Sequence, residues 1–331
     1  MKKLVALIIC YLLLSSHDMF LKMRTYHLRP YSPAVLDLYN GTFDRSDNII
    51  SRDRMIDVSM VGSGVRTSID TSAWVDVDKT TVLNFSTGDQ GTWMVGVSTA
   101  PRNIELAADA FNDYLEHDGV IDMLTWRKEH NTLDQDAIEK YSKHVKTIFQ
   151  VGDKRSDDWS KELGYPIEFI PLSNPYETEV GGKLSFKLLR AGAPLADQLV
   201  YVPTNNHNHS HDDGHHHDEE DHHHHEATQL RTDDQGIVEV PITHAGVWFV
   251  RTIHMELVDE PGLTHESNWA TITFEVGQSE DAAPGTHVHS DGSVHEDHHH
   301  HGLPSYAYVL GGILLLAGIY FGARRKSKPS N

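Results

Sequence analysis

The chain has 331 residues, with 28 basic, 48 acidic and 25 histidine side chains, and a formal charge of −20 at pH 7. This length gives room for about two domains of ~150 residues each, and the acidic balance argues against nucleic acid as a partner. The only cysteine, Cys10, excludes a disulfide framework, so an exported form would depend on its hydrophobic cores.

Residues 1–16 have the three parts of a secretory signal peptide. Two lysines precede the apolar run Leu4–Leu14, and two serines follow it. The run is too short to span a bilayer comfortably. Cleavage after Ser16 would make His17 the amino terminus, where the amine and the imidazole together can chelate a transition metal. Cleavage one residue away would remove this chelate.

Residues 17–151 are predicted to form a β-sandwich with a helical insertion at about 105–150. Apolar and polar residues alternate in the first part, and Gly-rich breaks separate the segments 56–62, 79–87 and 91–99.

The insertion is predicted from a change of period after about residue 105. Thr132–Gln135 has capping-box spacing for a last helix. His144 lies at the rim of that helix's apolar stripe and is a metal-ligand candidate, although a helix histidine is more often structural. The stripe consists of Ile138, Tyr141, Val145, Ile148 and Phe149.

Residues 163–277 show a second pattern of short strands separated by turns. The motif Gly-x-Pro-Leu-x-x-Gln-Leu-Val begins at Gly192, and Thr-Asp-x-x-Gly and Ala-Gly-x-Trp follow it. This succession resembles the transthyretin-like or carboxypeptidase-regulatory-like sandwich, which implies an adapter fold without chemistry of its own. We therefore expect two tandem β-sandwich domains, the second interrupted by a loop at 207–226.

That loop and a second segment, 287–301, are runs of histidine and carboxylate that hold 17 of the 25 histidines. Imidazole and carboxylate are ligands for zinc, nickel, cobalt and copper, so both runs are predicted to bind divalent metal. A passive polar spacer is the alternative, although spacers are normally rich in Gly, Ser, Pro or Glu. The candidate ligands in the runs are His207, His209, His211, His215, His216, His217, His222, His223, His224, His225, His287, His289, His295, His298, His299, His300 and His301.

A more ordered metal site is predicted outside the runs, formed by His17 with His27 or His254. His254 follows the apolar strand Val247–Ile253, and strand ends often carry functional residues. A structural polar role is the alternative for His254. His27 reaches His17 only if the chain folds back on itself.

The carboxyl-terminal part is predicted to anchor the chain in a membrane. A linker, 278–304, contains the second run, and 305–323 is an uncharged apolar segment of about the length that spans a bilayer. The tail, 324–331, begins with two arginines and a lysine, which places it on the cytoplasmic side by the positive-inside rule. We expect a single-pass inner-membrane protein with its large amino-terminal region in the periplasm.

Several segments in order resemble one bacterial family of exported domains of unknown function. They are HDMFLKMRTYHLRP, NGTFDRSDNIISRDRM, ELAADAFNDYLEHDG, EKYSKHVKTIFQVGD, GYPIEFIPLSNPYE, and RTIHM with ESNWATITFEV, and they cover about residues 17–276. The family is associated with the periplasmic component of cobalt/nickel ABC-type uptake, also called a nickel-uptake substrate-specific region. The resemblance implies a metal-associated periplasmic protein without established catalysis, with His17 as its first candidate ligand. Met19 stands where an X-X-His nickel chelate needs histidine.

The leading hypothesis is a membrane-anchored periplasmic protein that binds nickel or cobalt, with zinc or copper as alternatives, as an accessory to metal uptake or handling. The inner membrane and a metal transporter are its expected partners. The alternative is a non-catalytic envelope scaffold whose histidine runs are pH-responsive spacers. We expect no enzyme, because the sequence has no zincin helix, nucleophile elbow or phosphate-binding glycine loop.

Overall fold

The computed structural model describes residues 17–203 and 227–277. Strands account for 52% and helices for 13%, which confirms the prediction of a mainly β protein with several sheets. The predicted signal peptide, both histidine runs, the linker, the apolar segment 305–323 and the tail lie outside the described residues. Among the helices of the described part, none is long and apolar enough to cross a membrane.

The elements follow one another along the chain as a long series of strands with one pair of α-helices. The strands are β1 (Asp18–Met23), β2 (His27–Leu28), β3 (Pro33–Gly41), β4 (Met55–Gly62), β5 (Val65–Ser68), β6 (Trp74–Val77), β7 (Thr80–Ser86), β8 (Gly91–Thr99), β9 (Arg102–Leu106), β10 (Ala137–Val151), β11 (Ile167–Pro171), β12 (Lys183–Arg190), β13 (Ala193–Pro194), β14 (Leu199–Pro203), β15 (Ala227–Arg231), β16 (Ile237–Pro241), β17 (Gly246–Leu257) and β18 (His265–Val276). The helices are α2 (Ala108–His117) and α3 (Ile121–Glu129), with short 3-10 turns η1 (Arg52–Arg54), η2 (Thr71–Ala73), η3 (Asp158–Ser160) and η4 (Pro175–Glu177).

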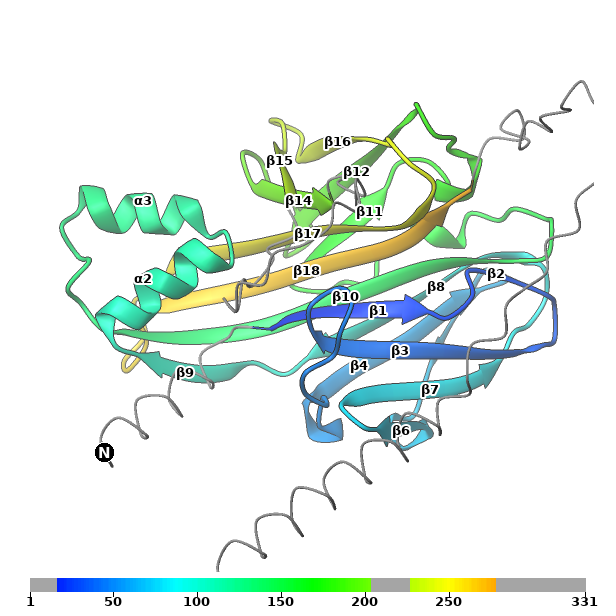
Figure 1. Cartoon of the computed structure of the whole chain (residues 1–331), viewed down its shortest axis with the longest axis horizontal. Helices are drawn as coiled ribbons and strands as arrows, with labels where there is room; N and C mark the ends of the chain where they lie inside the picture. Colours follow the sequence, from blue (N-terminus) through cyan, green and yellow to red (C-terminus); the bar gives the residue numbers. More distant parts are fainter. Residues whose placement is uncertain (1–16, 204–226, 278–331) are drawn as a thin grey trace, which may run out of the picture. The chain divides into compact units, whose positions relative to one another are not determined.

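A ten-stranded sheet runs through both halves of the chain. Its order is β15-β14-β17-β18-β10-β8-β4-β5, and β2 and β9 also pair with β10. The long strands β10 and β18 lie side by side and parallel, with Glu139 opposite His265 and Thr147 opposite Thr273 (Figure 1). The two predicted tandem sandwiches therefore share their main sheet, and residues 151–163 do not separate two independent sheets.

Two smaller sheets cover the two faces of this shared sheet. Val145 and Phe149 of β10 pack in one core with β1, β3 and β7, whereas Ile148 packs in a second core with β11, β12 and β16. Alternate residues of a strand point to opposite faces, so neighbouring side chains of β10 enter different cores. The helices α2 and α3 form a third core at one end of the shared sheet, which includes Trp269 of β18 (Figure 1).

The prediction of a helix through residues 138–149 is wrong, because this segment is the 15-residue strand β10. From Ser142 onward every residue of β10 is buried. A strand covered on both faces loses its alternation of polar and apolar residues, and its apolar positions can then match helical spacing by coincidence. The expected capping box, Thr132–Gln135, lies between α3 and β10 and begins no helix.

The first histidine run connects two strands that are paired with each other. Pro203 at the end of β14 lies opposite Ala227 at the start of β15. Residues 204–226 therefore leave and rejoin the fold at one point, at the end of an antiparallel pair on the edge of the ten-stranded sheet. This agrees with the expectation that the run is inserted between two strands.

Candidate functional site

The four predicted ligands among the described residues do not come together. His17 precedes β1 and His27 follows it, so the six residues of β1 hold them roughly 20 Å apart. His27 is half exposed, with its Nε2 3.6 Å from Glu275 Oε2. Within residues 17–203 and 227–277, no three His, Cys, Asp or Glu side chains are grouped as a metal ion would require.

His144 and His254 do share a face of the ten-stranded sheet, two strands apart. Asn268 of β18 lies directly opposite both Ser142 and His254 in the register. Its Oδ1 is 3.4 Å from His144 Nε2. Strands lie about 4.8 Å apart and His144 is offset by two residues from the row of Asn268 and His254, so the two histidine backbones are separated by roughly 12 Å.

His144 is held by hydrogen bonds inside the fold. Its Nδ1 is 2.9 Å from the Ser98 hydroxyl, and its Nε2 is 3.0 Å from the Ser142 hydroxyl. Burial lowers the pKa of His144 to about 4, and the hydrogen bond that Asn268 Oδ1 accepts from the ring acts in the other direction. Binding a metal would require one of these hydrogen bonds to break, which favours a structural role for this ring.

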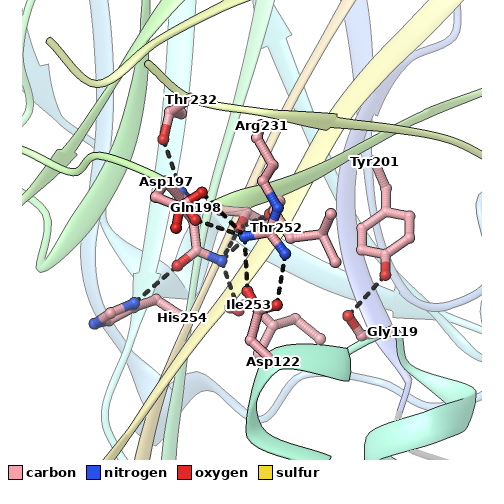
Figure 2. A network of polar contacts seen from close by, with 11 residues as sticks. Gly119, Asp122, Asp197, Gln198, Tyr201, Arg231, Thr232, Thr252, Ile253 and His254 are labelled. Atoms are coloured by element: carbon pink, nitrogen blue, oxygen red, sulfur yellow. Dashed lines mark hydrogen bonds and ion pairs between the residues drawn. The ribbon is translucent and has the colours of Figure 1, made fainter. Parts of the chain in front are cut away.

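His254 ends a polar network that joins three strands (Figure 2). Its Nδ1 is 2.9 Å from Gln198 Oε1, and the amide nitrogen of Gln198 donates to the Thr252 hydroxyl at 3.0 Å. Burial lowers the pKa of His254, whereas Glu256 raises it. The ring is one-fifth exposed, with Nε2 3.9 Å from Glu256. One ring nitrogen thus remains close to solvent and a carboxylate.

Two buried histidines make stability depend on pH. Burial lowers the pKa of both His144 and His265 from 6.5 to about 4, and the Arg127 charge adds to the effect on His265. The unfolded chain therefore binds protons in a range where the folded chain does not. This contribution to stability is present above pH ~6.5 and is lost as pH falls from ~6.5 towards ~4, by roughly 1.4 kcal/mol per pH unit for each ring.

We predict that urea unfolding of the wild type shows a lower free energy of unfolding at pH 5 than at pH 7. His144→Gln removes one of the two titrating rings, so its loss between these two pH values should be smaller. An equal loss in the two proteins would contradict the assignment of a depressed pKa to His144.

A second candidate site is a pocket of about 530 Å³ on the opposite face of the ten-stranded sheet. Its floor consists of β9, β10 and β18, which lie side by side. Arg102 is opposite Tyr141, and Trp269 is opposite Lys143, so these side chains share one face. We call it the basic pocket. It is lined by His17, Asn40, Asn48, Ile49, Ile50, Ser51, Arg54, Arg102, Ile104, Leu106, Tyr114, Glu139, Tyr141, Lys143 and Trp269.

Lys143 is the most deeply buried cation of this pocket. Burial lowers its pKa from 10.5 to about 8, although the charge of Asp18 acts in the other direction. Its ammonium donates to the backbone carbonyl of His17 and lies 4.7 Å from the centre of the Trp269 ring. The backbone at His17 is therefore attached to the pocket floor.

Glu139 is the carboxyl group in the pocket lining. It accepts hydrogen bonds from Tyr114, at 3.0 Å, and from the Ser267 hydroxyl. Burial raises the pKa of Glu139, and these two hydrogen bonds act against that rise. The carboxyl is thus already engaged within the floor.

His17 lies at the edge of the basic pocket, where its ring meets a loop. Its Nε2 is 3.6 Å from Asp47 Oδ2 and 3.5 Å from Asn48 Nδ2. A carboxylate beside one ring nitrogen is the arrangement that orients metal-binding histidines. Of the four predicted ligands among the described residues, His17 is the one that lies in a pocket.

Residues 14–256 match the model of a family described as a domain of unknown function. The chain belongs to this family, DUF4198. No curated protein matches it.

Among solved structures, this DUF4198 chain is similar to the D0–D1 domain of intimin. The identity is 11%, the TM-score is 0.18, and the match covers 78% of this chain and 97% of that one. A Salmonella alpha-2-macroglobulin mutant gives 12% identity and a TM-score of 0.21, with 78% of this chain and 15% of that one covered. The Escherichia coli adhesin FdeC gives 10% identity and a TM-score of 0.21, and the match covers 71% of this chain and 59% of that one. TM-scores this low carry no inference about fold or function.

Apart from His17, the sequence does not point to the residues of the basic pocket, and those on β10 lie in a segment whose apolar spacing predicts a helix. With a period of two, Glu139, Tyr141 and Lys143 fall on one face of a strand. A lysine and a glutamate on the same face as the buried Val145 and Phe149 would then have indicated a buried polar site. Arg54 and Arg102 reach the pocket only through tertiary pairing, and no local pattern signals them.

Proposed function

We propose that this DUF4198 protein is an exported, membrane-anchored binder of divalent transition metals. Nickel or cobalt is favoured, with zinc or copper as alternatives. The observation that carries the proposal is the pair of runs at 207–226 and 287–301, which hold 17 of the 25 histidines beside many carboxylates. A role in nickel or cobalt uptake, and a carboxypeptidase-regulatory-like second domain, belong to the same proposal.

The runs are proposed to capture metal with low selectivity. Imidazole-rich ligands follow the general affinity series of divalent metals, and a run without fixed geometry adds little discrimination. The carboxylates between the histidines attract cations, and protons compete for the imidazoles. Capture should therefore weaken as pH falls below ~6.5, the ordinary pKa of histidine.

The attachment of the first run supports a holding role beside the folded body. β14 and β15 flank the run, and both are tied to the helices. Arg231 of β15 forms a two-point contact with the Asp122 carboxylate, at 2.9 and 2.5 Å, and Tyr201 of β14 donates to the Gly119 carbonyl at 2.7 Å (Figure 2). Metal captured by the run would thus stay beside the fold and, with the proposed anchor, near a membrane transporter.

The test is equilibrium dialysis of the full chain against nickel, cobalt, zinc and copper. The wild type should bind several equivalents of metal, and a variant with every histidine of both runs replaced by serine should lose most of them. The serine variant keeps chain length and all carboxylates, so it isolates the contribution of imidazole. Equal binding by the two proteins would overturn the proposal.

A second variant, lacking 207–226, tests the first run alone. The deletion leaves three residues between Pro203 and Ala227, which are paired, and three residues are enough for a hairpin loop. We expect its unfolding midpoint to stay close to that of the wild type while the amount of bound metal falls. Unfolding of this variant would show that the run has a structural role.

A further inference from the structure

The basic pocket contains a buried arginine whose hydrogen-bonding capacity is largely unused. Arg54 is 7% exposed, and its guanidinium carries five N–H donors. Its Nη2 donates to the Ala100 carbonyl at a long 3.4 Å, its charge lies 5.2 Å from the centre of the Tyr141 ring, and its buried Nε has no hydrogen-bond partner. A buried cation with unpaired donors is costly unless an anion joins it.

Two further cations lie in the same lining. Arg102 is half exposed, and its contacts are long: 3.5 Å to the Ser51 hydroxyl and 3.9 Å to the exposed carboxylate of Asp53. Lys143 donates to the His17 carbonyl, and its other hydrogen bond, to Asn40 Oδ1, is 3.5 Å long. The lining thus contains these three cations and one carboxyl, Glu139, which already accepts hydrogen bonds from Tyr114 and Ser267.

The two arginines are close enough to repel each other. Burial lowers the pKa of Arg54 and the charge of Arg102 adds to this effect, whereas Tyr141 and the charge of Asp53 act in the other direction. In a chain of net charge −20, such a concentration of cations around a hollow is unusual. An anion placed between the two guanidinium groups would relieve the repulsion and satisfy the free donors with charge-assisted hydrogen bonds.

We propose that the basic pocket binds a small organic anion, whose carboxylate pairs with Arg54 and Arg102 and whose apolar body packs against Tyr141 and Trp269. The volume, about 530 Å³, lies within the range of small-molecule sites. The lining also includes the aliphatic side chains of Ile49, Ile104 and Leu106 beside polar residues such as Asn40 and Ser51. An inorganic anion would leave this apolar surface uncovered, so the lining favours an organic carboxylate.

The test uses benzoate and its neutral isostere benzamide, titrated calorimetrically into the full chain dialysed free of metal and chelator. Benzoate should bind saturably with a Kd of about 1 mM or below, and benzamide at least about tenfold more weakly. Arg102→Gln should weaken benzoate at least about tenfold. Arg102 is half exposed, so its replacement should leave the fold intact. The matched control is Arg29→Gln, which removes an exposed arginine outside the pocket and should leave benzoate affinity unchanged.

Four outcomes would overturn the proposal. The first is the lack of saturable benzoate binding up to about 10 mM, and the second is equal binding of benzoate and benzamide. The third is benzoate binding that Arg102→Gln leaves unchanged. The fourth is found by titrating inorganic phosphate separately. If phosphate binds as tightly as benzoate, the pocket binds any anion and has no preference for an organic carboxylate. Because the protein is free of metal, these results are independent of whether the histidine runs bind metal.

Discussion

Replacing Glu168 with glutamine is expected to lower the free energy of unfolding by about 3–5 kcal/mol, because the change leaves a buried cation without its partner. Glu168 and Lys146 form an ion pair between β11 and β10, with side chains only 3% and 2% exposed. The carboxylate also accepts hydrogen bonds from the backbone amides of Leu163, at 3.0 Å, and Gly164, at 2.8 Å. Its removal therefore disturbs the contact between two layers of the fold.

The expected size of this loss has a physical ceiling. Burial already lowers the pKa of Lys146 from 10.5, and the charge of Glu168 is the main effect that opposes it. Without Glu168, the lysine can lose its proton rather than remain charged. Deprotonating a lysine of ordinary pKa at pH 7 costs at most about 5 kcal/mol, because each unit between the pH and the pKa costs roughly 1.4 kcal/mol.

Urea unfolding of a double variant separates the charge effect from lost packing. Adding Lys146→Met to Glu168→Gln removes the stranded cation, so the double variant should recover most of the lost stability. The matched control is the exposed pair Lys183–Glu239, whose side chains are 63% and 55% exposed. Glu239→Gln should cost less than about 1 kcal/mol. If Glu168→Gln lost as little stability as Glu239→Gln, the buried ion pair would not stabilise the contact between β10 and β11.

The sequence was informative where a glycine-rich break or a turn bounded a strand, or where a segment was too polar to form a core. The alternating segments at 56–62 and 91–99 correspond to β4 and β8, and the run at 207–226 lies between two paired strands as expected. In these cases the signal is local: a period of two, a glycine-rich break, or a segment too polar to form a core. Such features can be read from the sequence because they do not depend on which segments become neighbours in the fold.

The shared sheet and the basic pocket required information that no local window contains. β10 and β18 are parallel, and Tyr141 pairs with Ser267 across more than a hundred residues of intervening chain. Parallel pairing needs a long crossover and has no turn signature. The pocket then depends on this pairing, since the strands supply its floor while η1 supplies Arg54. A pattern that predicts each strand still does not predict which strands become neighbours.

The second large effect is expected at Phe149, in the middle of β10. Phe149→Ala should lower the free energy of unfolding by about 3–5 kcal/mol, because the ring is fully buried between the ten-stranded sheet and the sheet of β1, β3 and β7. Its centroid lies 5.9 Å from that of Phe85 in an edge-on contact, which is lost as well. Ile56→Ala, at a side chain 62% exposed on β4, is the control and should change stability by less than about 0.5 kcal/mol.

A double-mutant cycle with the neighbouring residue distinguishes the strand from a helix. Ile148 is also fully buried, but in the other core, with β11, β12 and β16. Ile148→Val and Phe149→Leu are mild enough to leave the protein folded, at about 1 kcal/mol each. Because the two side chains point to opposite faces of β10, their effects on urea unfolding should add within about 0.5 kcal/mol. Coupling above about 1 kcal/mol would mean that both side chains share one core, as a helical stripe requires, and would contradict the layered arrangement of the three sheets.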